Sequence, residues 1–408
     1  MSVEELLPLL TKPSRYLGCE HNVIHKNWQE VSFRAVLAFP DLYEIGMSHH
    51  GLQILYHILN RQDEFLAERV YTPDRDLEEL LRQKNEPLFA LESGRPICDF
   101  DMLGITLPYE LCYTNILTIL DLAGIPFYSK DRDLSHPLII GGGPCAFNPE
   151  PVADFFDAIL LGDGEEAVIA IAKTIQSAKK NGSSRLDTLS ELSGIPGVYV
   201  PSFFSPEYSD GTFVGVQSLK TGYGPVRRAV LAAFAKDSFY DKPLVPQTRI
   251  VHDRLGIELA RGCTRGCRFC QAGMIYRPVR ERRPEDVMEI ARQGIKNGGF
   301  DELALLSLST GDYSCLTPLL IDLMNNFVDQ QVSVSMPSMR VGTLTPEIME
   351  QVKRVRKSGF TIAPEAGSDR LRKVINKGIT EADLLDTIDR AFSLGWKNIK
   401  LYFMVGLT

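Results

Sequence analysis

The chain has 408 residues, of which 44% are hydrophobic and 24% are charged, and its formal net charge is -8. This length allows two or three domains, and the composition is ordinary for a soluble globular protein. The negative charge argues against a dedicated nucleic-acid-binding protein, which usually carries a basic excess. Glu4, Glu5 and Pro8 interrupt the first residues, so we expect no secretory signal peptide there. No apolar run reaches the roughly 18 residues of a membrane helix, so we expect a cytoplasmic protein.

The first half of the chain alternates between strand and helix patterns. The predicted elements are strands at 34–39, 101–107, 137–140 and 157–161 and helices at 46–60, 115–123 and 165–178. Apolar strands that alternate with helices are typical of a parallel sheet covered on both faces. Ligands of such sheets bind outside the carboxyl ends of the strands, where Gly141-Gly142-Gly143 and Gly162-Asp163-Gly164 follow two of them. Residues 31–195 therefore predict an α/β, Rossmann-like domain, preceded by a polar leader at 1–30.

Residues 196–250 have a different pattern, of short β-like segments. A hairpin is predicted around the turn Ser209-Asp210-Gly211, and Pro243 and Pro246 indicate a linker. This part of the chain is therefore expected to be a small β-rich connector.

A second strand–helix series occupies residues 251–408. The predicted strands are 257–260, 302–308, 332–339, 360–363 and 398–405, and the predicted helices are 284–297, 346 to about 359, and 380–395. A cap residue and a proline, Thr345-Pro346, favour the start of the second helix, and Thr380 with Asp383 favours the start of the third. Only three residues follow the fifth strand. We therefore expect an incomplete βα barrel and a truncated form of a longer protein.

Three of the eight cysteines lie within eight residues, at Cys263, Cys267 and Cys270, directly after a predicted strand. The other five are scattered, and we interpret them as inert thiols in a reducing cytosol. Four irons in an iron–sulfur cluster normally take four cysteine thiolates. Three clustered thiolates would leave one iron open to a non-protein ligand, and the amino and carboxylate groups of S-adenosylmethionine (SAM) could chelate that iron.

The neighbouring residues fit a cluster. Gly262 and Gly266 would let the loop wrap closely around inorganic sulfide, and Phe269 could shield it from solvent. Three arginines supply positive charge that favours thiolates: Arg261, Arg265 and Arg268. The alternatives are a zinc site or unliganded thiols. Structural zinc takes four protein ligands, whereas His252 lies eleven residues upstream and Cys315 lies far downstream.

The CxxxCxxC spacing after the first strand of a βα barrel resembles the signature of the radical SAM superfamily. The longer string GCTRGCRFCQAGMIYRPVRER is similar to a bacterial family of B12-binding-like radical SAM proteins of uncharacterised reaction. The resemblance extends over nearly the whole chain. It implies a Rossmann-like, cobalamin-binding-like domain followed by a partial (βα)6 barrel with a [4Fe-4S] cluster on Cys263, Cys267 and Cys270. It also implies an enzyme that cleaves SAM reductively to a 5′-deoxyadenosyl radical, with an electron donor such as flavodoxin or ferredoxin and an unknown substrate.

The same resemblance implies SAM contacts at the ends of the second to fifth barrel strands. The residues implied are Ser309, Gly311, Ser338, Arg340, Glu365 and Gly406. All lie where barrel enzymes build their sites, at the carboxyl ends of strands. The alternatives are simple glycine turns and helix caps. The segment from Glu365 to Arg370 also resembles the E-x-G-S-D segment of methylthiotransferase-like enzymes.

Cobalamin-binding domains use Asp-x-His-x-x-Gly after their first strand, and the corresponding segment here runs from Asp41 to Gly46. Tyr43 stands at the histidine position, and a neutral tyrosine is a poor cobalt ligand compared with imidazole. His49 and His50 come too late, and we expect them to be ordinary helix residues. Three roles of this domain therefore stay open. It could bind cobalamin without a protein axial ligand, bind another ligand in the same crevice, or serve as a substrate-binding lid.

Two other functions are considered. A methylthiotransferase-like enzyme that modifies RNA or protein would need a second cluster, and Cys19, Cys98, Cys112 and Cys145 are too widely spaced to suggest one. A non-enzymatic iron–sulfur electron carrier or sensor would need four cysteine ligands, and the βα pattern around the motif speaks against it. Neither a membrane nor a nucleic-acid partner is indicated.

Overall fold

The structure is a computed structural model, and it describes residues 3–234, 239–343, 345–356 and 360–407. The chain divides into two compact units, residues 1–231 with 244–252 and residues 232–243 with 253–408. None of the described helices is both long and apolar enough to cross a membrane.

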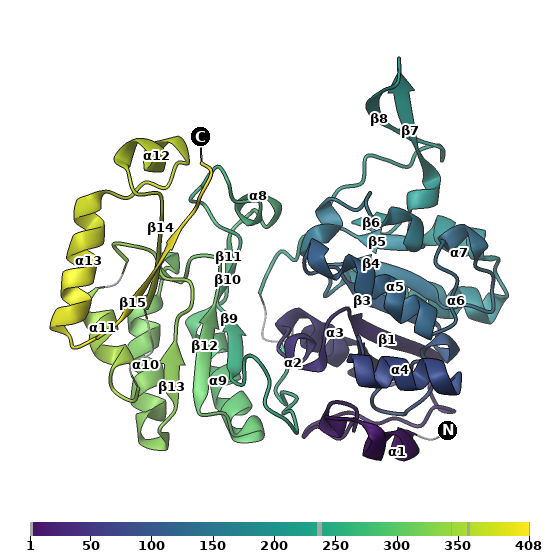
Figure 1. Cartoon of the computed structure of the whole chain (residues 1–408), viewed down its shortest axis with the longest axis horizontal. Coiled ribbons are helices and arrows are strands. Elements are labelled where there is room, and N and C mark those ends of the chain that lie inside the picture. Colours follow the sequence, from purple (N-terminus) through teal and green to yellow (C-terminus); the bar gives the residue numbers. More distant parts are fainter. Residues whose placement is uncertain (1–2, 235–238, 344, 357–359, 408) are drawn as a thin grey trace. The chain divides into compact units, whose positions relative to one another are not determined.

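The first unit is built on one sheet (Figure 1). Its strands are β1 (Phe33–Phe39), β2 (Phe65–Tyr71), β3 (Met102–Thr106), β4 (Leu138–Gly142), β5 (Ala158–Leu160) and β6 (Val198–Tyr199). Their order is β2-β1-β3-β4-β5-β6, and every pair is parallel except β5 with β6. The strand order reverses at β1, between β2 and β3, as in flavodoxin-like folds. The predicted parallel α/β sheet is confirmed.

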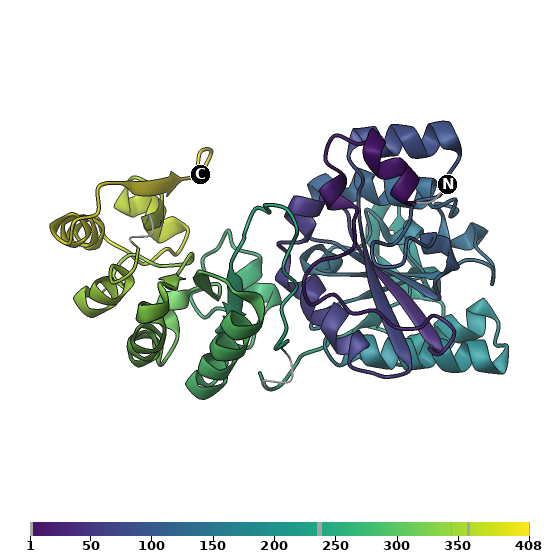
Figure 2. The ribbon, with the colours of Figure 1, turned by 90° about the horizontal axis from the view of Figure 1, so that it is seen from below.

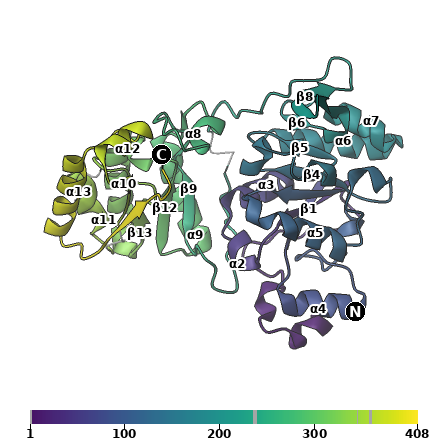
Figure 3. The ribbon, with the colours of Figure 1, turned by 45° about the horizontal axis from the view of Figure 1, so that its top comes forward.

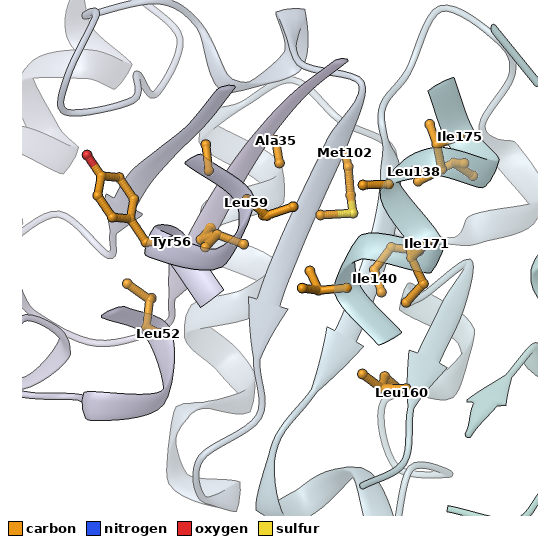
Figure 4. Close-up of a cluster of buried hydrophobic side chains, with 14 of the residues drawn as sticks. Ala35, Leu52, Tyr56, Leu59, Met102, Leu138, Ile140, Leu160, Ile171 and Ile175 are labelled. Carbon is orange, nitrogen blue, oxygen red and sulfur yellow. The ribbon is translucent and has the colours of Figure 1, made fainter. Parts of the chain in front are cut away.

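Helices cover both faces of this sheet, and the alternation along β1 shows why. Phe33, Ala35, Leu37 and Phe39 belong to one buried cluster, whereas Val36 and Ala38 belong to the other. The first cluster includes side chains of α3 (His50–Asn60), α6 (Ala167–Asn181) and α7 (Arg185–Leu192). Figure 4 shows Leu52, Tyr56 and Leu59 of α3 and Ile171 and Ile175 of α6 beside the strands. The second cluster includes side chains of α4 (Arg75–Lys84) and α5 (Tyr113–Leu122).

The N-terminal residues are part of this core. Leu6, at the end of α1 (Val3–Leu6), is buried with Leu10 and Tyr16 in the second cluster. Two short 3-10 helices follow, η1 (Leu7–Leu9) and η2 (Pro13–Arg15). The segment was expected to be a polar leader, but its apolar residues lie against the domain.

The predicted hairpin is formed by β7 (Phe204–Ser209) and β8 (Thr212–Ser218), joined through Asp210 and Gly211. Both turn residues have positive φ, 50° and 77°. The aromatic ring of Phe204 packs on Tyr199 and Tyr223. The base of the hairpin is thereby fixed to the end of the sheet.

The segment after β1 forms two helices where one was expected. A single turn, α2 (Tyr43–Gly46), precedes α3, and His49 is the N-cap of α3. The Nδ1 atom of His49 accepts the N–H of Leu52 at 3.1 Å. Burial lowers the pKa of His49 to about 4, which keeps the ring neutral and able to accept this bond. His49 is thus a capping residue, which corrects the expectation of an ordinary helix residue.

The second unit alternates strands and helices. Its strands β9 (Leu255–Glu258), β12 (Glu302–Leu306) and β13 (Ser333–Ser335) form a parallel sheet, and β14 (Phe360–Glu365) pairs in parallel with β15 (Ile399–Phe403). The longer helices are α9 (Pro284–Gly298), α10 (Leu316–Phe327), α11 (Pro346–Val352) and α13 (Glu381–Ser393). They form an arc along one side of the strands (Figure 2). This is the βα pattern that the sequence predicts.

Helix boundaries in this unit follow the predicted caps. The hydroxyl of Thr345 accepts the N–H of Ile348, and Thr380 forms a capping box with Asp383. The buried face of α9 includes Val287, Ile290, Ala291 and Ile295. However, α11 ends at Val352, earlier than expected, and the predicted end near residue 359 lies outside the described residues.

Glu68 makes the stability of the first unit depend on pH. Its side chain is buried in β2, where it accepts the hydroxyl of Ser93 at 2.6 Å. Burial raises the pKa of Glu68 to about 7, so ionisation opposes folding. The contribution of neutral Glu68 to the free energy of unfolding is fully present below pH 4.5 and is lost as the pH rises through about 7.

We therefore expect Glu68→Gln to lose less stability than the wild type between pH 5 and pH 8, with a difference of about 1–3 kcal/mol in the free energy of unfolding. Urea unfolding followed by circular dichroism at several pH values measures this. Glu79→Gln, at an exposed position of α4, is the matched control. If the free energy of unfolding falls equally with pH in the wild type and in Glu68→Gln, the raised pKa of Glu68 is contradicted.

Candidate functional site

The three clustered cysteines lie on one closed loop of the second unit. The loop leaves β10 (Ala260–Arg261) and returns through α8 (Ala272–Ile275) to β11 (Arg280–Glu281), and β10 pairs with β11 in antiparallel fashion. At its base Gly262 has a φ of 92°, and a Cβ there would lie 2.6 Å from the carbonyl oxygen of Tyr276. Only glycine permits this closure.

The three thiols are half-buried on this loop. The N–H of Arg265 points at the sulfur of Cys263 at 3.5 Å, and the N–H of Cys270 donates to the carbonyl of Cys267 at 3.0 Å. Among the described residues, no three His, Cys, Asp or Glu side chains form a group that could hold a single metal ion. An iron–sulfur cluster makes a different demand, since each thiolate binds its own iron. Three thiols on one loop fit that demand.

An ion pair joins the loop to the end of β12. The guanidinium of Arg265 donates to both carboxylate oxygens of Asp312, with Nε 2.7 Å from Oδ2. The hydroxyl of Ser309 donates to the same Oδ2 at 2.7 Å. The hydrogen bond from Arg265 is the main reason that the pKa of Asp312 lies below its ordinary value. A charged, bidentate pair of this kind holds the loop in a defined orientation.

The ends of β12 and β13 are linked to each other. The N–H of Thr310 donates to the carbonyl of Ser338 at 3.0 Å. Gly311 lies so close to Thr343 that an added Cβ would be 2.1 Å from its hydroxyl oxygen. That hydroxyl donates to the carbonyl of Arg340 at 2.8 Å. Four of the predicted SAM residues therefore lie at adjacent strand ends: Ser309, Gly311, Ser338 and Arg340.

A third connection runs through the turn after α12 (Asp369–Val374). The guanidinium of Arg340 donates to the carbonyl oxygens of Lys377 and Gly378. Lys377 donates in turn to Oε1 of Glu365 at 3.1 Å. The Lys377 ammonium also lies 5.9 Å from the ring centroid of Phe269 in the cysteine loop. The ends of β13 and β14 and the cysteine loop are thus tied to one turn.

Glu365 has an uncommon backbone conformation. It ends β14 with a φ of 66°, in the left-handed region, and its carbonyl accepts the N–H of Met404 at 2.9 Å. A non-glycine residue in this region costs about 1–2 kcal/mol, and such strain concentrates at functional sites. The pairing of β14 with β15 shifts register between Ile362 and Glu365. Gly406 also has positive φ, at 82°, and within the described part of the chain, apart from its two neighbours, no atom lies within 4 Å of the position of an added Cβ.

The prediction missed three residues that connect these strand ends: Asp312, Asn376 and Lys377. The amide nitrogen of Asn376 donates to the carbonyl of Gly266 at 2.9 Å. Asn376 and Gly378 both have positive φ, and the sequence Asn-Lys-Gly is an available turn signal. For Asp312 the only signal was its position in Ser-Thr-Gly-Asp after a predicted strand.

In the first unit, Tyr43 is turned into the core. Its ring is 2% exposed, and its hydroxyl donates to Oε1 of Glu20 at 2.9 Å. Burial, followed by the charge of Glu20, raises the pKa of Tyr43 above its ordinary value. At the carboxyl ends of the neighbouring strands, Asp41 accepts the hydroxyl of Tyr109, and Leu111 is 91% exposed. The phenol of Tyr43 is therefore committed to an internal partner.

Two family models match the chain. The model described as radical SAM proteins, N-terminal, matches residues 51–201. The model of the radical SAM superfamily matches residues 257–408, which include the cysteine loop and all four strand ends.

Curated proteins are also similar to this chain. An uncharacterized protein of Methanocaldococcus jannaschii is 31% identical over 376 residues, which cover 91% of this chain and 69% of the relative. A tRNA-2-methylthio-N(6)-dimethylallyladenosine synthase of Staphylococcus epidermidis is 22% identical over 153 residues, which cover 36% of this chain and 30% of that enzyme.

Solved structures show the same fold. The radical SAM methyltransferase TsrM from Kitasatospora setae, solved with cobalamin and a [4Fe-4S] cluster, has a TM-score of 0.58 at 13% identity, and the match covers 92% of this chain and 69% of TsrM. The cobalamin-dependent radical SAM enzyme OxsB, solved with aqua-cobalamin and SAM, has a TM-score of 0.57 at 15% identity, over 91% of this chain and 49% of OxsB.

The chain therefore belongs to the radical SAM superfamily and is an enzyme. This family implies a [4Fe-4S] cluster and SAM as cofactors. The alternative of a non-enzymatic electron carrier is set aside.

Proposed function

We propose that this enzyme holds a [4Fe-4S] cluster on Cys263, Cys267 and Cys270 and cleaves SAM reductively. The observation that carries the proposal is the closed loop with three thiols, tied by Arg265 and Asp312 to the end of β12. When bound, the cluster supplies an electron to the sulfonium of SAM, which then yields methionine and a 5′-deoxyadenosyl radical. The cofactors carry out the electron transfer and bond cleavage, and the protein binds and orients them.

The residues at the strand ends would position SAM. The backbone around Ser309 and Gly311 would hold the amino group, and Ser338 and Arg340 would reach the carboxylate or ribose. Glu365 would accept hydrogen bonds from the ribose hydroxyls, since Lys377 keeps its carboxylate in place. We assign Gly406 to the adenine side, where a side chain would obstruct close approach.

Anaerobic reconstitution with iron and sulfide, followed by dithionite reduction with SAM, tests the proposal. We expect about four irons per chain, an electron paramagnetic resonance signal that changes when SAM is added, and 5′-deoxyadenosine detected by mass spectrometry. A complete cluster that never yields 5′-deoxyadenosine would overturn it.

We also propose that the first unit binds cobalamin without an axial ligand from residue 43. TsrM and OxsB, which share the fold, were solved with cobalamin. The carboxyl ends of β1 and β3 flank the point where the strand order reverses, which is where such sheets bind ligands. The exposed Leu111 offers this edge an apolar contact for a large ring. Tyr43 is directed away, toward Glu20.

Tyr43→Phe is therefore expected to leave the affinity for hydroxocobalamin within about twofold of the wild-type value. Leu111→Asp is expected to weaken it by at least about fivefold, because an exposed apolar contact is replaced by a charge. Titration followed by visible absorbance measures both affinities. Loss of binding in a folded Tyr43→Phe variant would instead identify the phenol as a ligand.

Methylthio transfer is less well supported. The similarity to the Staphylococcus epidermidis synthase covers only a third of each chain.

A further inference from the structure

Positive charge is concentrated around the cysteine loop. Residues 261–283 contain seven arginines and one glutamate, and residues 369–377 contain four basic residues and one aspartate. The whole chain has a formal net charge of -8. Two segments far apart in the sequence therefore carry a local charge opposite to that of the protein.

The two segments lie side by side. The N–H of Arg268 donates to the carbonyl of Ile375 at 2.9 Å, and its guanidinium donates to the carbonyl of Val374. Asn376 adds the bond to Gly266. The end of α12 is thereby fastened along the cysteine loop, and α8 and α12 lie at the same end of this unit (Figures 1 and 3).

Several charges here are not neutralised. Arg370 and Lys373 are exposed on α12 and have no acidic partner within the described part of the chain. Phe269 of the cysteine loop and Val374 of α12 are 42% and 38% exposed. We name these residues the α12 patch: Arg268, Phe269, Arg370, Lys373 and Val374. It combines exposed apolar side chains with exposed basic ones.

We propose that the α12 patch is the docking surface for an acidic electron-donor protein of the flavodoxin type. The inference rests on the proposed function, since a cluster that reduces SAM must itself be reduced. The patch includes Arg268 and Phe269 of the cysteine loop itself, so a partner seated there would bring its redox centre next to the thiols. Charge complementarity would steer an acidic partner to this surface and raise its association rate. Small interfaces are typical of redox encounters.

The electron-transfer step is balanced without bond formation between the proteins. One electron leaves the donor's fully reduced flavin, which is oxidised by one electron, and the cluster is reduced by one electron. No residue of the patch changes its covalent state. Its contribution is the lifetime and geometry of the encounter.

The test compares two reductants for the full-length, reconstituted enzyme. The patch variant is Arg370→Glu/Lys373→Glu, and the control is Arg75→Glu/Lys84→Glu, which makes the same charge change at exposed positions of α4. We expect the patch variant to bind purified flavodoxin at least about tenfold more weakly at low salt. Its flavodoxin-driven rate of 5′-deoxyadenosine formation should fall by the same factor. The dithionite-driven rate should stay within about twofold, because dithionite needs no docking surface.

The outcomes separate the two proposals. Absence of 5′-deoxyadenosine with dithionite in the wild type contradicts the proposed function, whereas flavodoxin binding still tests the patch. Equal flavodoxin binding and equal flavodoxin-driven rates in both variants overturn the docking proposal. Loss of binding to a labelled RNA oligonucleotide in the patch variant, with flavodoxin binding unchanged, would overturn it in favour of a nucleic-acid surface.

Discussion

Cys267→Ala is expected to abolish 5′-deoxyadenosine formation. The proposed cluster has three protein ligands, and alanine removes one of the three thiolates. Loss of an outer-shell partner of a metal site costs about 10–100-fold, so loss of a direct ligand should cost more than that. Iron content, the visible absorbance of the cluster and 5′-deoxyadenosine measured by mass spectrometry should all fall together.

The matched control for this substitution is Cys315→Ala. Cys315 is also half-buried in the second unit, but it is the N-cap of α10 and lies outside the cysteine loop. Its variant should retain iron and activity. A Cys267→Ala variant that keeps both would exclude the three-thiolate cluster, whereas loss of activity in both variants would point to general destabilisation.

The sequence predicted that three cysteines share one loop, because that feature is local. Cys263, Cys267 and Cys270 do lie on one loop, and their role as cluster ligands stays a prediction. Gly262 could be recognised as a close-approach position, and in the structure an added Cβ would lie 2.6 Å from the carbonyl oxygen of Tyr276. The helix caps at Thr345 and Thr380 were predictable for the same reason, since each depends on residues only three positions apart.

The connections between strand ends were not predictable, because they join residues far apart in the sequence. The Arg265–Asp312 pair spans 47 positions, and the bond from Asn376 to Gly266 spans 110. Lys377 gave no signal of its own, since a lysine after a short helix is usually a solvated surface residue. The proposed SAM contacts therefore stay predictions that rest on position and resemblance, at Ser309, Gly311, Ser338, Arg340, Glu365 and Gly406.

Strand β2 was missed for a physical reason. Its sequence, FLAERVY, places Glu68 and Arg69 in the middle of a strand that is buried along its whole length. Charged residues usually mark exposed positions, so the pattern did not indicate a core strand. The pairing that allows their burial is made with residues outside the strand, Glu20, Glu92 and Ser93.

Arg69→Met is expected to destabilise the first unit by about 3–5 kcal/mol. The guanidinium of Arg69 is fully buried, and it bonds Glu20 at 2.8 Å and Glu92 at 2.6 Å. Its remaining terminal nitrogen donates to the sulfur of Met47 at 3.2 Å. Methionine fills a similar volume but leaves two buried carboxylates without a cation, and an uncompensated buried charge is costly.

The pH dependence of the destabilisation by Arg69→Met identifies its cause. Burial alone would raise the pKa of Glu20, and Arg69 holds it below its ordinary value. Burial raises the pKa of Glu92 even beside Arg69. Without the cation both carboxyls should take up protons more readily in the folded state, so the defect should be larger at pH 8 than at pH 5.5.

Urea unfolding of wild type, Arg69→Met and Arg82→Met at both pH values tests this. Arg82 also pairs with two carboxylates, Glu78 and Asp121, but its side chain is 46% exposed, so its replacement should cost less than about 1 kcal/mol. A defect in Arg69→Met that is equally large at both pH values would indicate lost packing against Tyr56 and Met47 instead of unpaired charge. A pH-dependent defect would show that a buried ion network, anchored by the N-terminal Glu20, holds this edge of the sheet and the ring of Tyr43 in place.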